Sequence, residues 1–389
     1  MKQLLIFAFL SAMFLGAKAQ NQFEAIELQV VDNNAALASM RQSNKAMNLN
    51  EDSENRPDGP EVEFEHLWGR GGVTKWSAGV SQSFDWPWTY SSRSKASKAR
   101  SDARAMMLAM ERADVVFKAR QLMIEIVGIR LQMEFADSML SNLERLMNRT
   151  RLAVERGQAT RLDLSKTRFA ILSLRRDRDA LSLQLNSSRT ELTALNGGKS
   201  IDISSLCSYP AATLLDEKSY IEAFDNNPAY APAMNAQTEA ARASAAAEAR
   251  SSWPGFSIGY RHAFEEQTHF NGLTVGIKLP SFATGNKRKA AEAEIVARSL
   301  DMDNYTFSSH ARIMADVANA RRLAAGLLDY EDAFDSVDYA GILERLYENA
   351  QISVIDYITE INYYLDIRRQ YLQMQNEYQL TLAALNRYL

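Results

Sequence analysis

Four short stretches of this chain alternate strictly between apolar and polar residues. Within residues 61–65, for example, glutamates alternate with Val62 and Phe64. A period of two places the apolar side chains on one face of a β-strand and the polar side chains on the other. The pattern therefore predicts two strand pairs, within residues 61–87 and 254–280, each linked by a polar turn that contains glycine and each ended by a proline.

Long helical segments are expected around these strands. The chain has only 17 Gly and 8 Pro in 389 residues, which favours long helices and excludes an all-β sandwich with frequent turns. Each strand pair is followed by a stretch of some 60 residues, which as a helix spans about 90 Å, and then by a shorter return helix with apolar residues at coiled-coil intervals. The expected helices cover residues 24–47, 90–153 and 160–196 in the first half and 216–250, 283–347 and 353–388 in the second.

The two halves repeat each other at a constant offset of 193 residues. Chemically different stretches keep this offset without a gap, which indicates a duplication. The matching residues include Asp32-Asn33-Asn34 with Asp225-Asn226-Asn227, Gly79 with Gly272, Pro87 with Pro280, Glu155 with Glu348, Thr160 with Ser353, and Asp163 with Asp356. We expect a first repeat over 20–199, a linker over 200–212 and a second repeat over 213–389.

The first 19 residues read as a signal peptide. Lys2 gives a positive start, an apolar run follows, and Ala17-Lys18-Ala19 is a small-x-small cleavage site. No later stretch holds 18 uncharged apolar residues, so no transmembrane helix is expected after it. The protein is therefore predicted to be exported.

Composition and charge argue against several classes of function. The formal net charge of −4 offers no basic excess for nucleic acid. The single cysteine, Cys207, excludes an intrachain disulfide framework, and the four histidines leave little for a zinc site. His66, on the apolar side of its predicted strand, and His262 and His269, near the second turn, are interpreted as surface or girdle residues. No catalytic motif stands out, so we expect no enzyme, no catalytic residue, no cofactor and no metal.

All five tryptophans lie in or beside the strand pairs: Trp68, Trp76, Trp86, Trp88 and Trp253. Tryptophan at the ends of short amphipathic strands is typical of the aromatic girdle of a membrane β-barrel. Four strands cannot close a barrel alone, whereas two chains supply eight strands and three supply twelve. The alternative is a small soluble sheet at the end of a coiled coil.

The order of these segments resembles one known family. Helix, strand pair ending in proline, long helix, a Gly-x-x-Thr-x-Leu-Asp turn and a return helix ending in Leu-Asn-Gly occur after a signal peptide and then recur in degenerate form. This order is similar to that of the TolC-like outer-membrane efflux proteins, over nearly the whole mature chain. The resemblance implies a mainly α fold with a small β part, which as a homotrimer forms a 12-stranded outer-membrane β-barrel continued by a periplasmic α-helical tunnel.

The resemblance also assigns roles to the two hairpin tips. The residues expected to contact a periplasmic adaptor protein are Gly157, Gln158, Thr160, Ala350, Gln351 and Ser353. The residues expected to line the periplasmic gate are Asp163, Asp356 and Glu360, although the two aspartates also suit the first turn of a helix. Family members usually carry glycine where this chain has Ala350, and alanine tolerates a left-handed conformation poorly.

The function expected from the resemblance is a passive exit duct in the outer membrane, with a periplasmic extension. Its partners would be two further copies of the chain, a periplasmic adaptor, an inner-membrane pump and outer-membrane lipid, in a tripartite efflux or type I secretion system. The alternative is a periplasmic coiled-coil adaptor or interaction protein with a soluble sheet. The alternating strands and the clustered tryptophans argue against that alternative.

Overall fold

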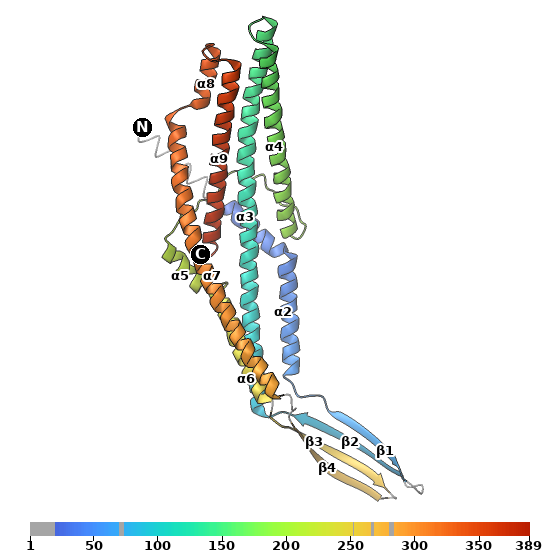
Figure 1. Ribbon diagram of the computed structural model, residues 1–389. Helices are drawn as coiled ribbons and strands as arrows, with labels where there is room; N and C mark the ends of the chain where they lie inside the picture. Colours follow the sequence, from blue (N-terminus) through green and yellow to red (C-terminus); the bar gives the residue numbers. More distant parts are fainter. Residues whose placement is uncertain (1–19, 70–73, 252, 266–267, 280–283) are drawn as a thin grey trace. The chain divides into compact units, whose positions relative to one another are not determined.

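The computed structural model describes residues 20–69, 74–251, 253–265, 268–279 and 284–389 (Figure 1). The expected signal peptide, residues 1–19, lies outside this range. The chain is mostly helical with one small sheet, as predicted. A helix over residues 20–33 is followed by α2 Ala35–Glu54, β1 Glu61–Trp68, β2 Thr74–Phe84, α3 Pro87–Glu155, α4 Arg161–Leu195, α5 Glu217–Asn226, α6 Ala231–Ser251, β3 Gly255–Glu265, β4 Thr268–Lys278, α7 Thr284–Ser336, α8 Tyr339–Glu348 and α9 Val354–Asn386.

Three of the predicted helices were wrong in one respect: each was expected to be continuous, but the structure divides each into two helices. The first breaks at Asn34, whose Oδ1 accepts a hydrogen bond of 2.9 Å from the amide of Leu37 and so starts a new helix. The predicted helix 216–250 is divided into α5 and α6 around Pro228, which cannot continue a helix. The predicted helix 283–347 is interrupted before Tyr339, where the side chain of Asp338 caps α8.

The chain forms two compact units, and both halves of the sequence contribute to each. One unit comprises Met1–Ala38, Glu111–Phe224 and Ser309–Leu389, and the other comprises Ser39–Met110 and Asp225–Ser308. The first unit contains the part of α3 from Glu111 onward, which forms a helical hairpin with α4, and the second hairpin α8–α9. They share one hydrophobic core, to which α3 contributes Leu143, α4 Ile171, α8 Leu343 and α9 Ile358.

The second unit contains the sheet and the helices next to it. The strand order is β1-β2-β3-β4, and every neighbouring pair is antiparallel. The central pairing joins β2 of the first repeat to β3 of the second, with Val80 opposite Tyr260. The sheet therefore ends in two different edge strands, β1 and β4.

Candidate functional site

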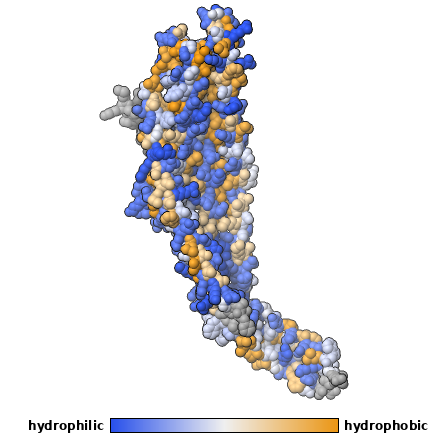
Figure 2. Space-filling model, viewed as in Figure 1, coloured by the Kyte–Doolittle hydropathy of each residue, from blue (hydrophilic) through white to orange (hydrophobic). Residues whose placement is uncertain are grey.

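One face of the sheet carries exposed apolar side chains, and Figure 2 shows apolar residues among hydrophilic ones on this part of the surface. The register places Val62, Val80, Tyr260 and Leu273 in one row across the four strands, so they share a face. Val62 is 81% exposed and Leu273 is 82% exposed. Large apolar side chains rarely stay this open to water in a contiguous patch, so this face indicates contact with lipid or with another apolar surface.

The tryptophans lie toward both ends of this sheet. Trp68 ends β1 and Trp76 lies near the start of β2, at the end where the hairpin turns are. At the other end, the rings of Trp86 and Trp88 stack with centroids 4.9 Å apart, and Trp253 meets Trp88 edge-on at 5.6 Å. Two aromatic groups separated by an apolar band fit a membrane girdle, which remains a prediction for these five residues.

The opposite face of the sheet carries ion pairs. Arg261 on β3 lies 2.6 Å from Glu63 and 3.7 Å from Glu65, both on β1, and Lys75 on β2 lies 2.9 Å from Glu265 on β3. These pairs lie on the same side as the serines and glycines of β2 and β3. A water-filled interior suits this face.

The two hairpin tips are built alike. Gly157 has a φ of 73° and Ala350 a φ of 53°, and Ala350 is the only residue other than glycine with a positive φ in the described part of the chain. The amides of Gln158 and Gln351, directly after these residues, donate to Ala153 and Leu346 at 2.8 and 2.9 Å. Both helices therefore end in the same left-handed closing turn.

Each tip is followed by a capping box. The side chain of Thr160 accepts from the amide of Asp163, whose carboxylate accepts from the amide of Thr160. Ser353 and Asp356 repeat this arrangement at the start of α9. The backbone hydrogen bond from Thr160 holds the pKa of Asp163 below its usual value, and the hydroxyl of Ser353 does the same for the pKa of Asp356.

The third predicted gate residue, Glu360, lies one turn beyond Asp356 on α9. Its carboxylate accepts a hydrogen bond from the hydroxyl of Tyr339, at the start of α8. That bond to the carboxylate raises the pKa of Tyr339 to about 12. The structure thus gives each of the three carboxylates a partner within its own hairpin, and the gate role of Asp163, Asp356 and Glu360 remains a prediction.

Two helices expose apolar stripes at coiled-coil intervals. On α7, Leu300, Phe307 and Met314 follow one another in steps of seven and are exposed, Phe307 by 76%. On α4, Leu162 and Phe169 are seven residues apart and are also exposed. Apolar stripes of this spacing are typical of helices that pack against other helices.

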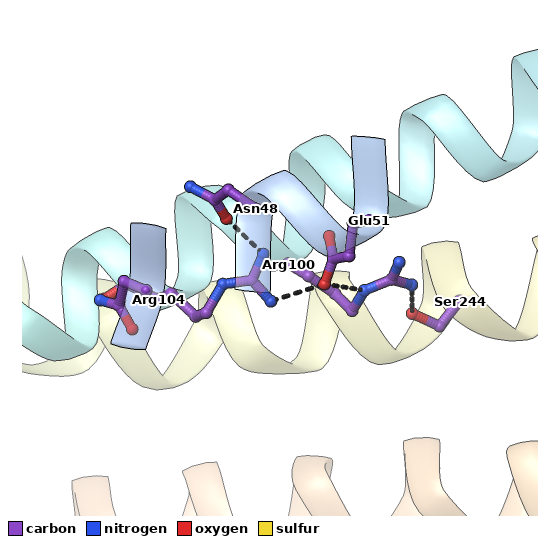
Figure 3. Close-up of polar contacts among 6 residues, drawn as sticks. Asn48, Glu51, Arg100, Arg104 and Ser244 are labelled. Carbon is purple, nitrogen blue, oxygen red and sulfur yellow. Dashed lines mark hydrogen bonds and ion pairs between the residues drawn. The ribbon is translucent and has the colours of Figure 1, made fainter. Parts of the chain in front are cut away.

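The basic residues at the start of α3 have acidic partners that the sequence did not reveal. Arg93 lies 2.7 Å from Asp85, the residue directly after β2. Figure 3 shows Arg100 and Arg104 converging on Glu51 of α2, at 3.0 and 2.7 Å. Burial raises the pKa of Glu51, but hydrogen bonds from both arginines outweigh it and lower that pKa to about 2. The acidic end of α2 was the only signal for these contacts.

Searches with the sequence match no family model and no curated protein. Solved structures match over almost the whole chain. CusC, described with its transmembrane channel formation, is 16% identical with a TM-score of 0.76, over 95% of this chain and 92% of its own. The outer-membrane channel OprN is 12% identical with a TM-score of 0.78, over 96% and 91%. The outer membrane protein VceC from Vibrio cholerae is 13% identical with a TM-score of 0.76, over 95% and 96%.

The chain has the fold of the TolC-like outer-membrane channels. The predicted fold class, mainly α with a small β part, is therefore confirmed. None of the helices in the described residues combines the length and the apolar character needed to cross a bilayer. Over the same residues, His, Cys, Asp and Glu nowhere come together in threes as a metal-binding group. In this TolC-like fold the features with functional potential are the sheet and the two helical tips.

Proposed function

We propose that the chain is an outer-membrane channel, assembled as a homotrimer, and that it is the exit duct of a tripartite efflux or type I secretion system. The observation that carries the proposal is the exposed apolar face of the four-stranded sheet. In lipid, backbone groups at a sheet edge have no water to bond, so β1 and β4 must pair with strands of other copies.

The two edges favour a closed ring of copies. Pairing of β1 in one copy with β4 in the next is a head-to-tail contact, which leaves no free edge only when the copies close into a ring. Three copies would supply twelve strands, and the TolC-like fold favours that number. The exposed stripes on α4 and α7 would be covered in the same assembly, since apolar heptad positions pack against helices of a neighbouring copy.

The path of the solute follows from the two faces of the sheet. The apolar face would meet lipid, and the face with Arg261, Glu63 and Glu265 would line the water-filled interior. The helices would continue this interior into the periplasm. Passage through such a duct is passive, and the proposal includes no chemical step and no cofactor.

The hairpin tips are the proposed docking site of a periplasmic adaptor, which would connect the duct to an inner-membrane pump. The tip residues are small or polar: Gly157, Gln158, Thr160, Ala350, Gln351 and Ser353. Small side chains let another helical hairpin approach closely. In the assembled ring, Asp163, Asp356 and Glu360 of each copy would contribute to a negatively charged gate.

The test is insertion of the purified protein into a planar lipid bilayer. The proposal predicts discrete steps of conductance, together with recovery of the protein from the outer-membrane fraction and a need for detergent during extraction. A detergent-only addition is the control for leakage. A protein that stays soluble without detergent and never raises the conductance would instead support the periplasmic adaptor.

A further inference from the structure

Two histidines form a close pair on the exposed apolar face of the sheet. His262 lies on β3 and His269 on β4, near the end where these two strands are joined. The Nε2 atom of His262 and the Nδ1 atom of His269 are 3.3 Å apart. Both side chains are within reach of solvent, His269 being exposed.

A neighbouring asparagine determines which nitrogen of His262 carries the proton. The Nδ1 atom of His262 lies 2.8 Å from Oδ1 of Asn271. An amide oxygen only accepts hydrogen bonds, so Nδ1 must donate. The hydroxyl of Tyr260 also donates to this Oδ1, at 2.6 Å, and helps hold the asparagine in place. The Nε2 atom of neutral His262 therefore keeps its lone pair, and that lone pair faces His269.

We propose that His262 and His269 together bind a divalent transition-metal ion. Zinc–imidazole bonds are about 2.0–2.1 Å long, so two nitrogens on one tetrahedral ion lie roughly 3.3–3.4 Å apart. The observed separation of 3.3 Å matches this span. Binding requires only that the rings turn so that both lone pairs meet the ion and that His269 moves its proton to Nε2.

The contact to Asn271 is the kind of support that metal-binding histidines have. Such a histidine usually donates its second N–H to a carbonyl or carboxylate, which fixes the tautomer and the ring orientation. His262 has this donor bond before any metal arrives. With two protein nitrogens, the remaining positions on the ion would be filled by water, because the pair lies at the hairpin end of the sheet, beside the predicted girdle residue Trp76 and outside the apolar band proposed to meet lipid.

The ligand type selects the metal. Imidazole nitrogens suit Cu²⁺, Ni²⁺ and Zn²⁺, with Cu²⁺ bound most tightly in the general order of affinities, whereas Mg²⁺ and Ca²⁺ prefer oxygen. A bound ion would link β3 to β4 at the hairpin end and so stabilise the folded sheet by mass action. The site is complete within one chain and stands independently of the proposed channel function.

The test is a Cu²⁺ titration of the full chain in detergent, in a Cys207→Ser background so that the thiol does not reduce the ion. Trp76 is a built-in reporter, since its ring centroid is 5.5 Å from that of His262. We expect one Cu²⁺ per chain, quenching of tryptophan fluorescence, and an electron paramagnetic resonance spectrum with two coupled imidazole nitrogens. Mg²⁺ should give no response.

Matched variants distinguish Cu²⁺ binding at this histidine pair from Cu²⁺ binding elsewhere on the chain. His262→Gln and His269→Gln should each raise the dissociation constant at least tenfold, and His66→Gln, on the same face without a second histidine, should leave it unchanged. Asn271→Leu keeps both rings and should weaken binding several-fold. Wild-type affinity in both His262→Gln and His269→Gln would overturn the site. If those variants do not fold, the wild-type protein still tests the proposal: an electron paramagnetic resonance spectrum without two coupled imidazole nitrogens would overturn the site equally.

Discussion

Arg261 on β3 and Glu63 on β1 form an ion pair of 2.6 Å although a complete strand, β2, lies between them. The residue of β2 in their row is Gly79, which has no side chain to separate them. On the other side of Arg261 the row continues with Gly272, the residue that corresponds to Gly79 in the second repeat. The duplicated glycine thus has a different role in each repeat.

Replacing Gly79 with valine should therefore destabilise the sheet more than replacing Gly272. A Cβ atom at Gly79 would lie 3.3 Å from the carbonyl oxygen of Tyr260, and the valine would stand between Arg261 and Glu63, whereas a Cβ atom at Gly272 meets nothing within 4 Å. We expect Gly79→Val to cost about 1 kcal/mol more in the free energy of unfolding. Urea unfolding in detergent measures the difference, and equal midpoints would contradict it.

A charge on the apolar face should block membrane assembly. Val275→Arg places a guanidinium where lipid is proposed, at a cost of about 2–4 kcal/mol per chain near mid-membrane. Thr274→Arg is the matched control, because Thr274, the residue of β4 directly before Val275, points to the opposite, polar face. The amount of protein in the outer-membrane fraction is the measurement. Equal amounts of the two variants would show that the faces have been assigned wrongly.

The turn at Ala350 should be improved by glycine. Alanine at a φ of 53° costs roughly 1 kcal/mol relative to glycine, so Ala350→Gly should raise the thermal unfolding temperature. The reverse change at the corresponding turn, Gly157→Ala, should lower it, although a Cβ atom there has open space. A lower unfolding temperature for Ala350→Gly would mean that this turn is not strained.

The gate hypothesis can be separated from the capping role of the same aspartates. At an effective dielectric constant of 20, two carboxylates 4 Å apart repel by about 4 kcal/mol, so a ring of them attracts cations. The double change Asp163→Ala and Asp356→Ala leaves only Glu360 of each copy in the proposed gate, so it should weaken cation selectivity and block by a trivalent cation in single-channel recordings. The control, Thr160→Ala with Ser353→Ala, removes the caps but keeps the carboxylates and should conduct as wild type. Unchanged selectivity after both aspartates are removed would leave them only their helix-capping role.

The elements that the sequence predicted well are those with a strong local signal. The alternation around Val62 and Val275 predicted the bounds of all four strands to within a few residues, because among regular structures only the β-strand places every second side chain on the same face. Asp163 and Asp356 lie in the first turn of their helices, a position that the sequence also suggested for them, and they complete the capping boxes there.

The features that the sequence did not reveal depend on contacts between distant segments. The helix break before Tyr339 has no counterpart in the first repeat, where α3 continues unbroken to Glu155. The partners of Arg100 and Arg104 come from a helix some 50 residues earlier. The close pair of His262 and His269 required the register of β3 and β4. None of these could be read from periodicity or propensity.

The number of chains in the detergent-extracted protein tests the central proposal most directly. Native mass spectrometry should give three copies for the wild type and for Thr274→Arg, because in the proposed closed ring of three copies β1 of each copy pairs with β4 of the next. Val275→Arg should not give this assembly. A single species of one chain, stable in water without detergent, would contradict the account.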